Sequence, residues 1–288
     1  MPYSARACWQ LGKPAISAAV SLSALTAFLM YTKGFTPGWL SLLLGIFFLS
    51  FSSSGINQIQ ERKYDSKMPR TSGRPLPSGQ ISVKQAWLVV VINGLAGSLL
   101  LWLAGGKAAM LLGWLNILLY NGIYTPLKTR TLFAMVPGSA VGAIPPLIGW
   151  ISAGGHPFHV HIVLLAMFFF VGQIPHTWLI LIRYDLEYRQ AGLPSLSRYF
   201  NQKQTSKLTF IWATATSLCI IMLGAFGLFS FQGFAAAGMG LAFMMVFWFA
   251  GQMFGRQTST RTRSSFVLLN GVYLCVMLMI IIDSLLIQ

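Results

Sequence analysis

Apolar residues in this chain are gathered into long runs that short polar stretches separate. Each run has roughly 18 to 23 residues, the length an α-helix needs to cross the hydrocarbon core of a bilayer. The runs cover 14–32, 38–56, 84–104, 108–124, 133–151, 160–182, 208–229, 234–253 and 265–286. Because backbone groups in lipid must be hydrogen-bonded within the segment, each run is predicted to be a helix.

The pattern therefore predicts an all-α, polytopic membrane protein with nine transmembrane helices. The connections are too short for a soluble domain, so residues 1–288 are expected to form a single transmembrane domain. Composition agrees, because 55% of the residues are hydrophobic and only 9% are charged. The first run is longer than a typical signal-peptide core and is expected to be retained as a span.

Basic residues outnumber acidic ones by 20 to 5, a balance that is also typical of nucleic-acid-binding proteins. Here they lie between the apolar runs rather than on one soluble face, which argues against a nucleic-acid partner. When alternate connections are tallied, Lys33 and Lys107 fall on one side and the other 18 of the 20 on the opposite side. The positive-inside rule then places the N-terminus in the cytoplasm and the C-terminus on the outer side of the inner cell membrane.

The connection after the second run carries a regular array of polar side chains. Asn57, Glu61 and Asp65 are four residues apart, which places three oxygen-bearing groups along one helical face. Carboxylates at this spacing repel each other unless a cation joins them. Such oxygen ligands suit Mg²⁺, which bridges carboxylates to substrate phosphates. Asp65 is expected to be exposed at the cytoplasmic edge, so that Asp65→Ala would abolish activity without unfolding the protein.

Basic residues follow this array directly. Pro69 disfavours helical geometry at Met68, so the helix is predicted to end there and the chain to turn. The turn would present Lys67, Arg70 and Arg74 near the same metal, where their charges can pair with phosphate oxygens. The alternative interpretation is an ordinary basic loop in which the acids merely balance charge.

A second acidic pair, Asp185 and Glu187, lies on the same side of the membrane as the first. The two acids are two residues apart, so on a helix they point to different faces and a site would use only one of them. Arg183 and Arg189 flank the pair and provide the alternative, a set of simple ion pairs.

A third segment contributes two further basic residues and a helix with small side chains. Lys128 and Arg130 lie in a short turn on the cytoplasmic side. In the span that follows, Gly138 and Gly142 have the spacing that usually indicates close helix packing.

Three sequence blocks together carry a resemblance to a known family. They are the Asn57, Glu61 and Asp65 array with KMPRTSGRPLPSG after it, YTPLK-x-RT with GAIPPLIGW, and PHTWLILIRYDLEYRQAGLP from Pro175 to Pro194. They resemble the signatures of the intramembrane (UbiA-type) prenyltransferase superfamily, in the form of the protoheme IX farnesyltransferases, or heme O synthases. One departure is Gln58, which stands where members often have aspartate.

The resemblance implies a fold and an activity. Nine helices would surround a central cavity opening to the cytoplasmic side. A farnesyl group would pass from farnesyl diphosphate to the 2-vinyl group of protoheme IX (heme B), with addition of water, to give heme O. Mg²⁺ would be the cofactor, and the lipid bilayer would hold both apolar substrates. Heme A synthase or assembly factors of terminal oxidases would be partners.

The resemblance also assigns roles to residues. Catalysis and Mg²⁺ binding fall to Asn57, Glu61, Asp65 and Glu187. Diphosphate contacts fall to Lys67, Arg70, Arg74, Lys128 and Arg130. Acceptor contacts fall to His176 and Tyr124, although an intramembrane histidine is as often a hydrogen-bonded packing residue. Glu187 is favoured over Asp185 because the family has an acid directly before a tyrosine.

Two other functions stay open. A related prenyltransferase acting on an aromatic, quinone-precursor or lipid acceptor would keep the diphosphate site and change the acceptor pocket. A membrane transporter would also have basic-inside spans, but it would carry ionisable residues at mid-membrane, where this chain has few. His156, His159 and His161 lie on the outer side, and their spacing predicts an ordinary loop rather than a metal site.

Overall fold

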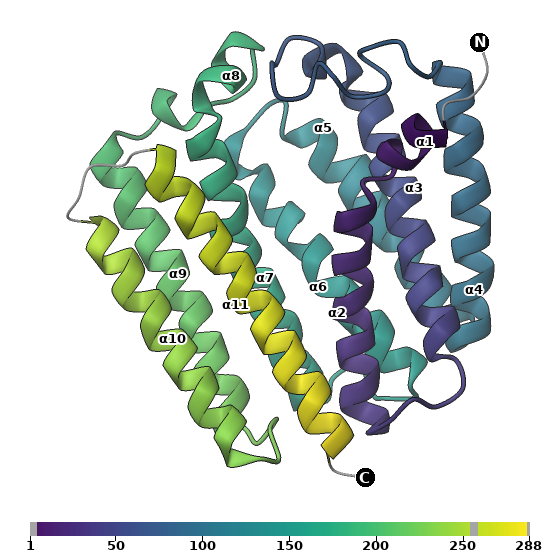
Figure 1. Ribbon diagram of the computed structural model, residues 1–288, viewed down its shortest axis with the longest axis vertical. Helices are drawn as coiled ribbons and strands as arrows, with labels where there is room; N and C mark the ends of the chain where they lie inside the picture. The colour runs from purple at the N-terminus through teal and green to yellow at the C-terminus, as the bar shows by residue number, and fades with distance from the viewer. Residues whose placement is uncertain (1–4, 254–258, 287–288) are drawn as a thin grey trace.

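The computed structural model of the chain describes residues 5–253 and 259–286, and every regular element in these ranges is a helix (Figure 1). Arg256, one of the residues counted on the cytoplasmic side, lies outside the described residues. Within those ranges, eight helices are long and apolar enough to cross a membrane. The prediction of an all-α, multi-pass membrane protein is therefore confirmed.

The long helices are α2 (Pro14–Thr32), α3 (Trp39–Asp65), α4 (Val83–Ile117), α6 (Met135–Ser152), α7 (Val160–Arg183), α9 (Gln202–Ala225), α10 (Gln232–Met253) and α11 (Ser259–Leu286). The short elements are α1 (Ala5–Leu11), the π-helix η1 (Leu118–Tyr124), α5 (Thr125–Leu127), η2 (Leu132–Ala134), α8 (Asp185–Gln190) and η3 (Leu196–Arg198).

The predicted third and fourth spans belong to one helical segment, Val83–Leu127, which has a break inside it. At Gly105 and Gly106 the backbone leaves the helical region, and Gly106 has φ 65°. A Cβ atom on Gly113 would lie 2.8 Å from Cδ1 of Leu101, whereas twelve residues of straight helix cover about 18 Å. The chain therefore turns back at the two glycines, and glycine is needed there because Gly106 has a positive φ.

Two helix boundaries differ from prediction near the polar residues. α3 ends at Asp65, three residues before the predicted end at Met68, and the chain then continues in turns. α9 begins at Gln202, six residues before the predicted apolar run. Its start is fixed by a capping box, in which the side chains of Asn201 and Gln204 each accept a backbone N–H at 2.9 Å.

One face of α4 carries a stripe of exposed apolar side chains. Leu88, Ile92, Leu95, Leu99 and Leu103 recur at helical spacing and are between 51% and 64% exposed. A continuous apolar stripe of this kind is unfavourable in water and favourable in a bilayer. The exposed stripe therefore agrees with a membrane-spanning orientation of α4.

Close backbone contacts hold the bundle together. A Cβ atom on Gly149 of α6 would lie 1.9 Å from the carbonyl oxygen of Ala24, so α2 and α6 touch backbone to backbone. Of the predicted small-residue pair, Gly142 lies against the carbonyl oxygen of Phe169 on α7, whereas Gly138 lies against the ring of Tyr124. Figure 1 shows α3 and α4 on one flank and α9 and α10 on the other. It also shows α1, α8 and the loop after α3 at the same end of the bundle.

Candidate active site

The last two turns of α3 hold both acids of the first cluster, and each acid is paired with a basic residue from a following loop. Glu61 forms an ion pair with Nζ of Lys128, which lies just after α5. Both carboxylate oxygens of Asp65 accept hydrogen bonds from one guanidinium nitrogen of Arg74 at 2.8 Å. The structure therefore brings two of the predicted diphosphate contacts to two of the predicted metal ligands.

Asp65 differs from expectation in one respect. Its side chain is 1% exposed, so the prediction that it lies exposed at the membrane edge is wrong. The turn after α3 covers it, because the hydroxyl of Thr71 donates to the backbone carbonyl of Asp65 at 3.0 Å and Arg74 closes over the carboxylate. Removing the carboxylate would leave the Arg74 charge without its partner in a largely buried position.

Asn57, the first member of the array, is also buried and is held from two sides. Its Oδ1 accepts a hydrogen bond from Nζ of Lys13 at 3.0 Å, and its Nδ2 donates to the hydroxyl of Thr125 at 3.3 Å. Lys13 immediately precedes α2, and Thr125 begins α5. Asn57 thus connects three segments that are far apart in the sequence.

The cations at this end of the bundle influence one another. Burial and the positive charges of Arg74 and Lys128 lower the pKa of the Lys13 ammonium to about 7. Burial also acts to lower the pKa of Lys128, but the carboxylate of Glu61 outweighs it and holds that pKa above its ordinary value. Three basic groups, Lys13, Arg74 and Lys128, thus face two carboxylates, and a Lys13 that is about half protonated near pH 7 still leaves a positive excess suited to an anionic ligand.

The second acidic pair reaches this cluster through one of its members only. Oε2 of Glu187, on α8, accepts a hydrogen bond from the backbone N–H of Arg70 at 3.3 Å. The Arg70 guanidinium lies over the ring of Tyr184, 4.5 Å from its centre. α8 and the turn after α3 are therefore in direct contact, as expected for two blocks of one site.

Asp185 contacts η3 and not the turn after α3. Its carboxylate accepts hydrogen bonds from the backbone N–H of Ser197 at 3.0 Å and from the Ser197 hydroxyl, and it thereby fixes the start of η3. Arg183 lies over the Tyr184 ring, 5.3 Å from its centre. Of the two acids, Glu187 is the one that contacts the turn after α3.

The π-helix η1 supplies the aromatic wall of the cluster. The ring of Tyr124 lies 5.1 Å from Nζ of Lys128 and stacks on Tyr120, with the ring centres 5.5 Å apart. A Cβ atom on Gly138 would lie 2.7 Å from the Tyr124 ring, so the glycine makes room for this tyrosine. The predicted acceptor contact Tyr124 therefore lies beside the predicted diphosphate contact Lys128.

Polar groups on α3 and η1 hold the π-helix in place. Asn121 accepts from the Ser53 hydroxyl at 2.6 Å and donates to the Ser53 carbonyl at 3.0 Å. Gln60 donates to the carbonyl of Asn121 at 2.9 Å. A π-helix shifts the side chains that follow it relative to an α-helix, and such segments often occur at functional sites.

The remaining predicted residues lie apart from these contacts. Lys67 and Arg130 are exposed on the turns after α3 and α5. His176 lies within α7, where its ring packs against Phe266 with centres 4.8 Å apart. Its Nδ1 is buried and has no hydrogen-bond partner in the part of the chain that the structure describes. A packing residue would normally have this nitrogen paired.

The oxygen atoms of Asn57, Glu61 and Asp65 are donors of the kind that a hard divalent cation binds, but they do not form one compact group among the described residues. Among residues 5–253 and 259–286, no group of three or more His, Cys, Asp or Glu residues lies close enough to hold a metal. Asn57, Glu61 and Asp65 still offer oxygen ligands on successive turns of one helix. These donors are of the kind that Mg²⁺ prefers, and two of them, Glu61 and Asp65, are paired with Lys128 and Arg74 in this structure.

The three histidines around the start of α7 have local structural roles. Nδ1 of His156 accepts from the backbone N–H of Phe158 at 3.4 Å, and Nδ1 of His159 accepts from that of His161 at 3.3 Å. These bonds fix the turn before α7, in agreement with the prediction of an ordinary loop.

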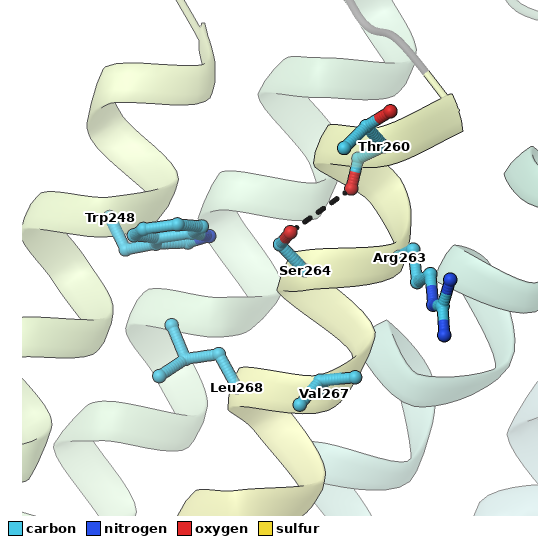
Figure 2. Close-up of a pocket in the computed structure, with 6 residues that line it drawn as sticks. All are labelled: Trp248, Thr260, Arg263, Ser264, Val267 and Leu268. Carbon is cyan, nitrogen blue, oxygen red and sulfur yellow. Dashed lines mark hydrogen bonds between the residues drawn. The ribbon is translucent and has the colours of Figure 1, made fainter.

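A separate surface pocket of ≈ 510 Å³ lies between α10 and α11 (Figure 2). It is lined by Trp248, Thr260, Arg263, Ser264, Val267 and Leu268. Figure 2 shows Arg263 directed away from Trp248, so the charge does not converge with the apolar wall. The pocket contains none of the predicted site residues.

Sequence reasoning missed two contributors to the cluster. Lys13 enters the sequence prediction only as a topological charge, although its place directly before the first apolar run is a usable signal. Asn121 carries no such signal, because its partners on α3 are more than 60 residues away in the sequence.

The fold and these contacts define a multi-pass membrane protein with a cluster of paired basic and acidic side chains at one end of its helix bundle. Residues 20–272 match the model of the UbiA prenyltransferase family, and the chain belongs to this family.

Curated relatives are similar over most of the chain. A protein of Nitratidesulfovibrio vulgaris (strain DP4) named protoheme IX farnesyltransferase is 35% identical over 243 residues, which cover 84% of this chain and 82% of the relative. A protein of the same name from Cytophaga hutchinsonii is 33% identical and covers 93% of both chains.

Solved structures share the fold. A UbiA homolog from Aeropyrum pernix K1 superposes with a TM-score of 0.76 at 19% identity and covers 94% of this chain and 98% of that one. A homolog from Archaeoglobus fulgidus, solved with DMAPP and Mg²⁺, has a TM-score of 0.67 at 16% identity and covers 94% and 98%. At these identities the likeness concerns the fold alone.

Proposed function

We propose that the chain transfers a farnesyl group from farnesyl diphosphate to the 2-vinyl group of protoheme IX, with addition of water, and so forms heme O. The observation that carries the proposal is the cluster at the end of α3, where the acids are joined to Lys128 and Arg74. The names of the relatives supply the acceptor, because they are called protoheme IX farnesyltransferases.

The first chemical step is loss of diphosphate from the allylic carbon of the farnesyl chain. The carbon–oxygen bond breaks with its electron pair on the diphosphate, and the barrier falls when cations stabilise that charge. Lys128 and Arg74, which are paired with the acids of α3, would stabilise this charge, and Arg70, Lys67 and Arg130 on the exposed turns after α3 and α5 would add to it. The vinyl group then attacks the allylic cation, and water adds to the resulting cation with loss of a proton.

Mg²⁺ is the proposed cofactor, and Asn57, Glu61, Asp65 and Glu187 are the residues that would hold it. When bound, the ion would neutralise charge on the leaving diphosphate. A structural neighbour from Archaeoglobus fulgidus was solved with Mg²⁺, which supports the assignment. Cationic partners that leave Glu61 and Asp65 would be free to pair with the diphosphate.

The acceptor side of the site is proposed to include Tyr124 and His176. Tyr124 lies against Lys128, where the ionising carbon would be close to the aromatic wall. Buried Nδ1 of His176 offers a hydrogen-bonding or ligating nitrogen inside the bundle. Both would contact an apolar acceptor held between helices and shielded from water.

The topology belongs to the same proposal. A straight 45-residue helix would be about 68 Å long, twice the thickness of a bilayer core, so we infer that Val83–Leu127 crosses twice and that the chain has nine spans. The basic end of the bundle is assigned to the cytoplasm of the inner membrane, with the N-terminus there and the C-terminus outside. We propose further that residues 1–288 form a single domain with a central cavity that opens to the cytoplasmic side. Heme A synthase or assembly factors of terminal oxidases are the proposed partners.

The direct test uses the purified chain in lipid nanodiscs with farnesyl diphosphate, protoheme IX and Mg²⁺. Mass spectrometry should detect a heme that has gained one farnesyl group and one hydroxyl group. A Glu61→Gln variant is the matched negative control, because it keeps the side-chain shape and removes the charge. If an aromatic or lipid acceptor is prenylated and protoheme IX is not, the assignment of protoheme IX as the acceptor is wrong. The proposed diphosphate-binding site would be retained in that case.

A further inference from the structure

The turn between α1 and α2 has an unusual backbone. Lys13 adopts the left-handed conformation, with φ 49° and ψ 63°, and Pro14 follows it. Residues with a side chain rarely adopt this conformation, and a residue before proline usually prefers an extended one. Such a backbone persists only where the surrounding structure enforces it, and it often marks a functional position.

Gln58 contacts the backbone directly before this turn. Its Nε2 donates hydrogen bonds to the carbonyl oxygens of Gln10 and Leu11, at 3.1 and 2.8 Å. These carbonyls lie at the end of α1, directly before the turn, and Gln58 is 1% exposed. On the other side of the turn, the ring of Phe51 fills the space that a Cβ atom on Gly12 would occupy, 2.0 Å away.

The result of this turn is the placement of one ammonium group. Nζ of Lys13 donates to Oδ1 of Asn57, the residue next to Gln58 on α3. One turn of α3 therefore fixes the lysine at both ends: Gln58 holds the backbone before it, and Asn57 holds its tip. The partner of Lys13 is a neutral amide, whereas Arg74 and Lys128 are each paired with a carboxylate.

We propose that Lys13 is a further contact for the diphosphate of the substrate, and that Gln58 is the positioning residue that directs it into the cluster. Nζ of Lys13 can pair with an arriving diphosphate without breaking an ion pair, and the negative charge of that diphosphate would favour the protonated ammonium. This inference rests on the proposed prenyl-transfer function and adds two residues to its site. The inference also gives a role to Gln58, which stands where members of the family often have aspartate.

The test is a double-mutant cycle on the full chain in nanodiscs. Wild type, Lys13→Met, Gln58→Met and the double variant are compared for kcat, KM for farnesyl diphosphate, and affinity for inorganic diphosphate with Mg²⁺. Lys13→Met should weaken diphosphate affinity roughly ten- to hundredfold, the scale of one charge-assisted hydrogen bond, and raise KM in parallel. Gln58→Met should have a similar but smaller effect, and Lys13→Arg should restore part of the affinity.

The cycle separates positioning from packing. If Gln58 acts through Lys13, then Gln58→Met has no further effect on diphosphate affinity once Lys13 is methionine. Gln60→Met is the matched control, because Gln60 also donates to a backbone carbonyl from α3 but holds η1 instead. Its effect on affinity should be the same in both backgrounds.

Two results would overturn the inference. One is a Gln58→Met protein that melts at lower temperature but binds diphosphate normally. The other is an affinity loss that is equal with and without Lys13. If Gln58→Met does not fold, Gln58→Asn is measured instead, since it keeps the amide and shortens the side chain. Failure of the proposed function shows separately, as a wild type that makes no heme product although diphosphate binding still responds to Lys13.

Discussion

Removing the carboxylate of Asp65 should damage both the fold and the reaction, and the two effects can be separated. Asp65→Ala leaves the guanidinium of Arg74 without its partner. A second variant, Asp65→Ala with Arg74→Met, removes the unpaired charge as well. We expect the double variant to recover much of the lost stability and none of the activity.

The magnitude follows from the burial of the two partners. The Asp65 side chain is 1% exposed and that of Arg74 is 22% exposed, and both carboxylate oxygens lie 2.8 Å from the same nitrogen. Breaking a fully buried pair costs about 3–5 kcal/mol, and the partial exposure of Arg74 reduces this to roughly 2–3 kcal/mol. A change of that size lowers the melting temperature of a chain of this length by roughly 4–10 °C.

The assay is thermal unfolding in detergent, followed by tryptophan fluorescence, together with heme product measured on the same samples. Wild type, both variants and Arg74→Met alone complete the cycle. An Asp65→Ala protein that melts like wild type would refute the buried ion pair. A double variant with wild-type turnover would refute the role of the carboxylate in the reaction.

Three further predictions concern other parts of the molecule. Glu187→Gln should lower turnover at least roughly tenfold. Asp185→Asn should keep turnover within about twofold of wild type and speed hydrogen exchange at residues 195–198. Equal effects of the two variants on turnover would contradict the assignment of Glu187 to the site. Asp283→Ala should lower the free energy of unfolding by about 2 kcal/mol and leave KM unchanged. The reason is that the backbone N–H groups of Ser230 and Phe231, which donate to the Asp283 carboxylate at 3.0 and 2.8 Å, lose their acceptor. An unchanged melting temperature would refute this prediction. Chelation of divalent cations should abolish product formation and added Mg²⁺ should restore it, so turnover in excess chelator would contradict the metal assignment.

The fold could largely be predicted from the sequence, because the length and apolarity of the runs directly encode membrane-spanning helices. The break at Gly105 and Gly106 was likewise visible, as a polar and glycine-rich interruption between two apolar runs. The end of α3 was misplaced by three residues, because the turn there is fixed by Asp65, Thr71 and Arg74 and not by the proline alone.

The site was only partly visible in the sequence for a physical reason. Spacing along one helix predicts that Asn57, Glu61 and Asp65 share a face, and α3 confirms it. Spacing says nothing about which loop returns to that face, so the contacts of Lys13 with Asn57 could not be predicted. Burial of Asp65 was also hidden, since a charged residue beside a loop usually lies in water.

The choice between Asp185 and Glu187 shows what geometry adds. On the sequence both acids lie in one short segment, and only the resemblance favoured one of them. The structure distinguishes them by their partners, because Asp185 fixes the start of η3 and Glu187 reaches the turn after α3. That assignment remains a prediction until the two variants are measured.

Heme O synthesis by this chain can be measured in a bacterial host that lacks its own heme O synthase, by mass spectrometry of the extracted hemes. We expect heme O with the intact chain and only heme B with Asp65→Asn at equal membrane expression. Heme B alone with the well-expressed intact chain would contradict the assignment of protoheme IX as the acceptor.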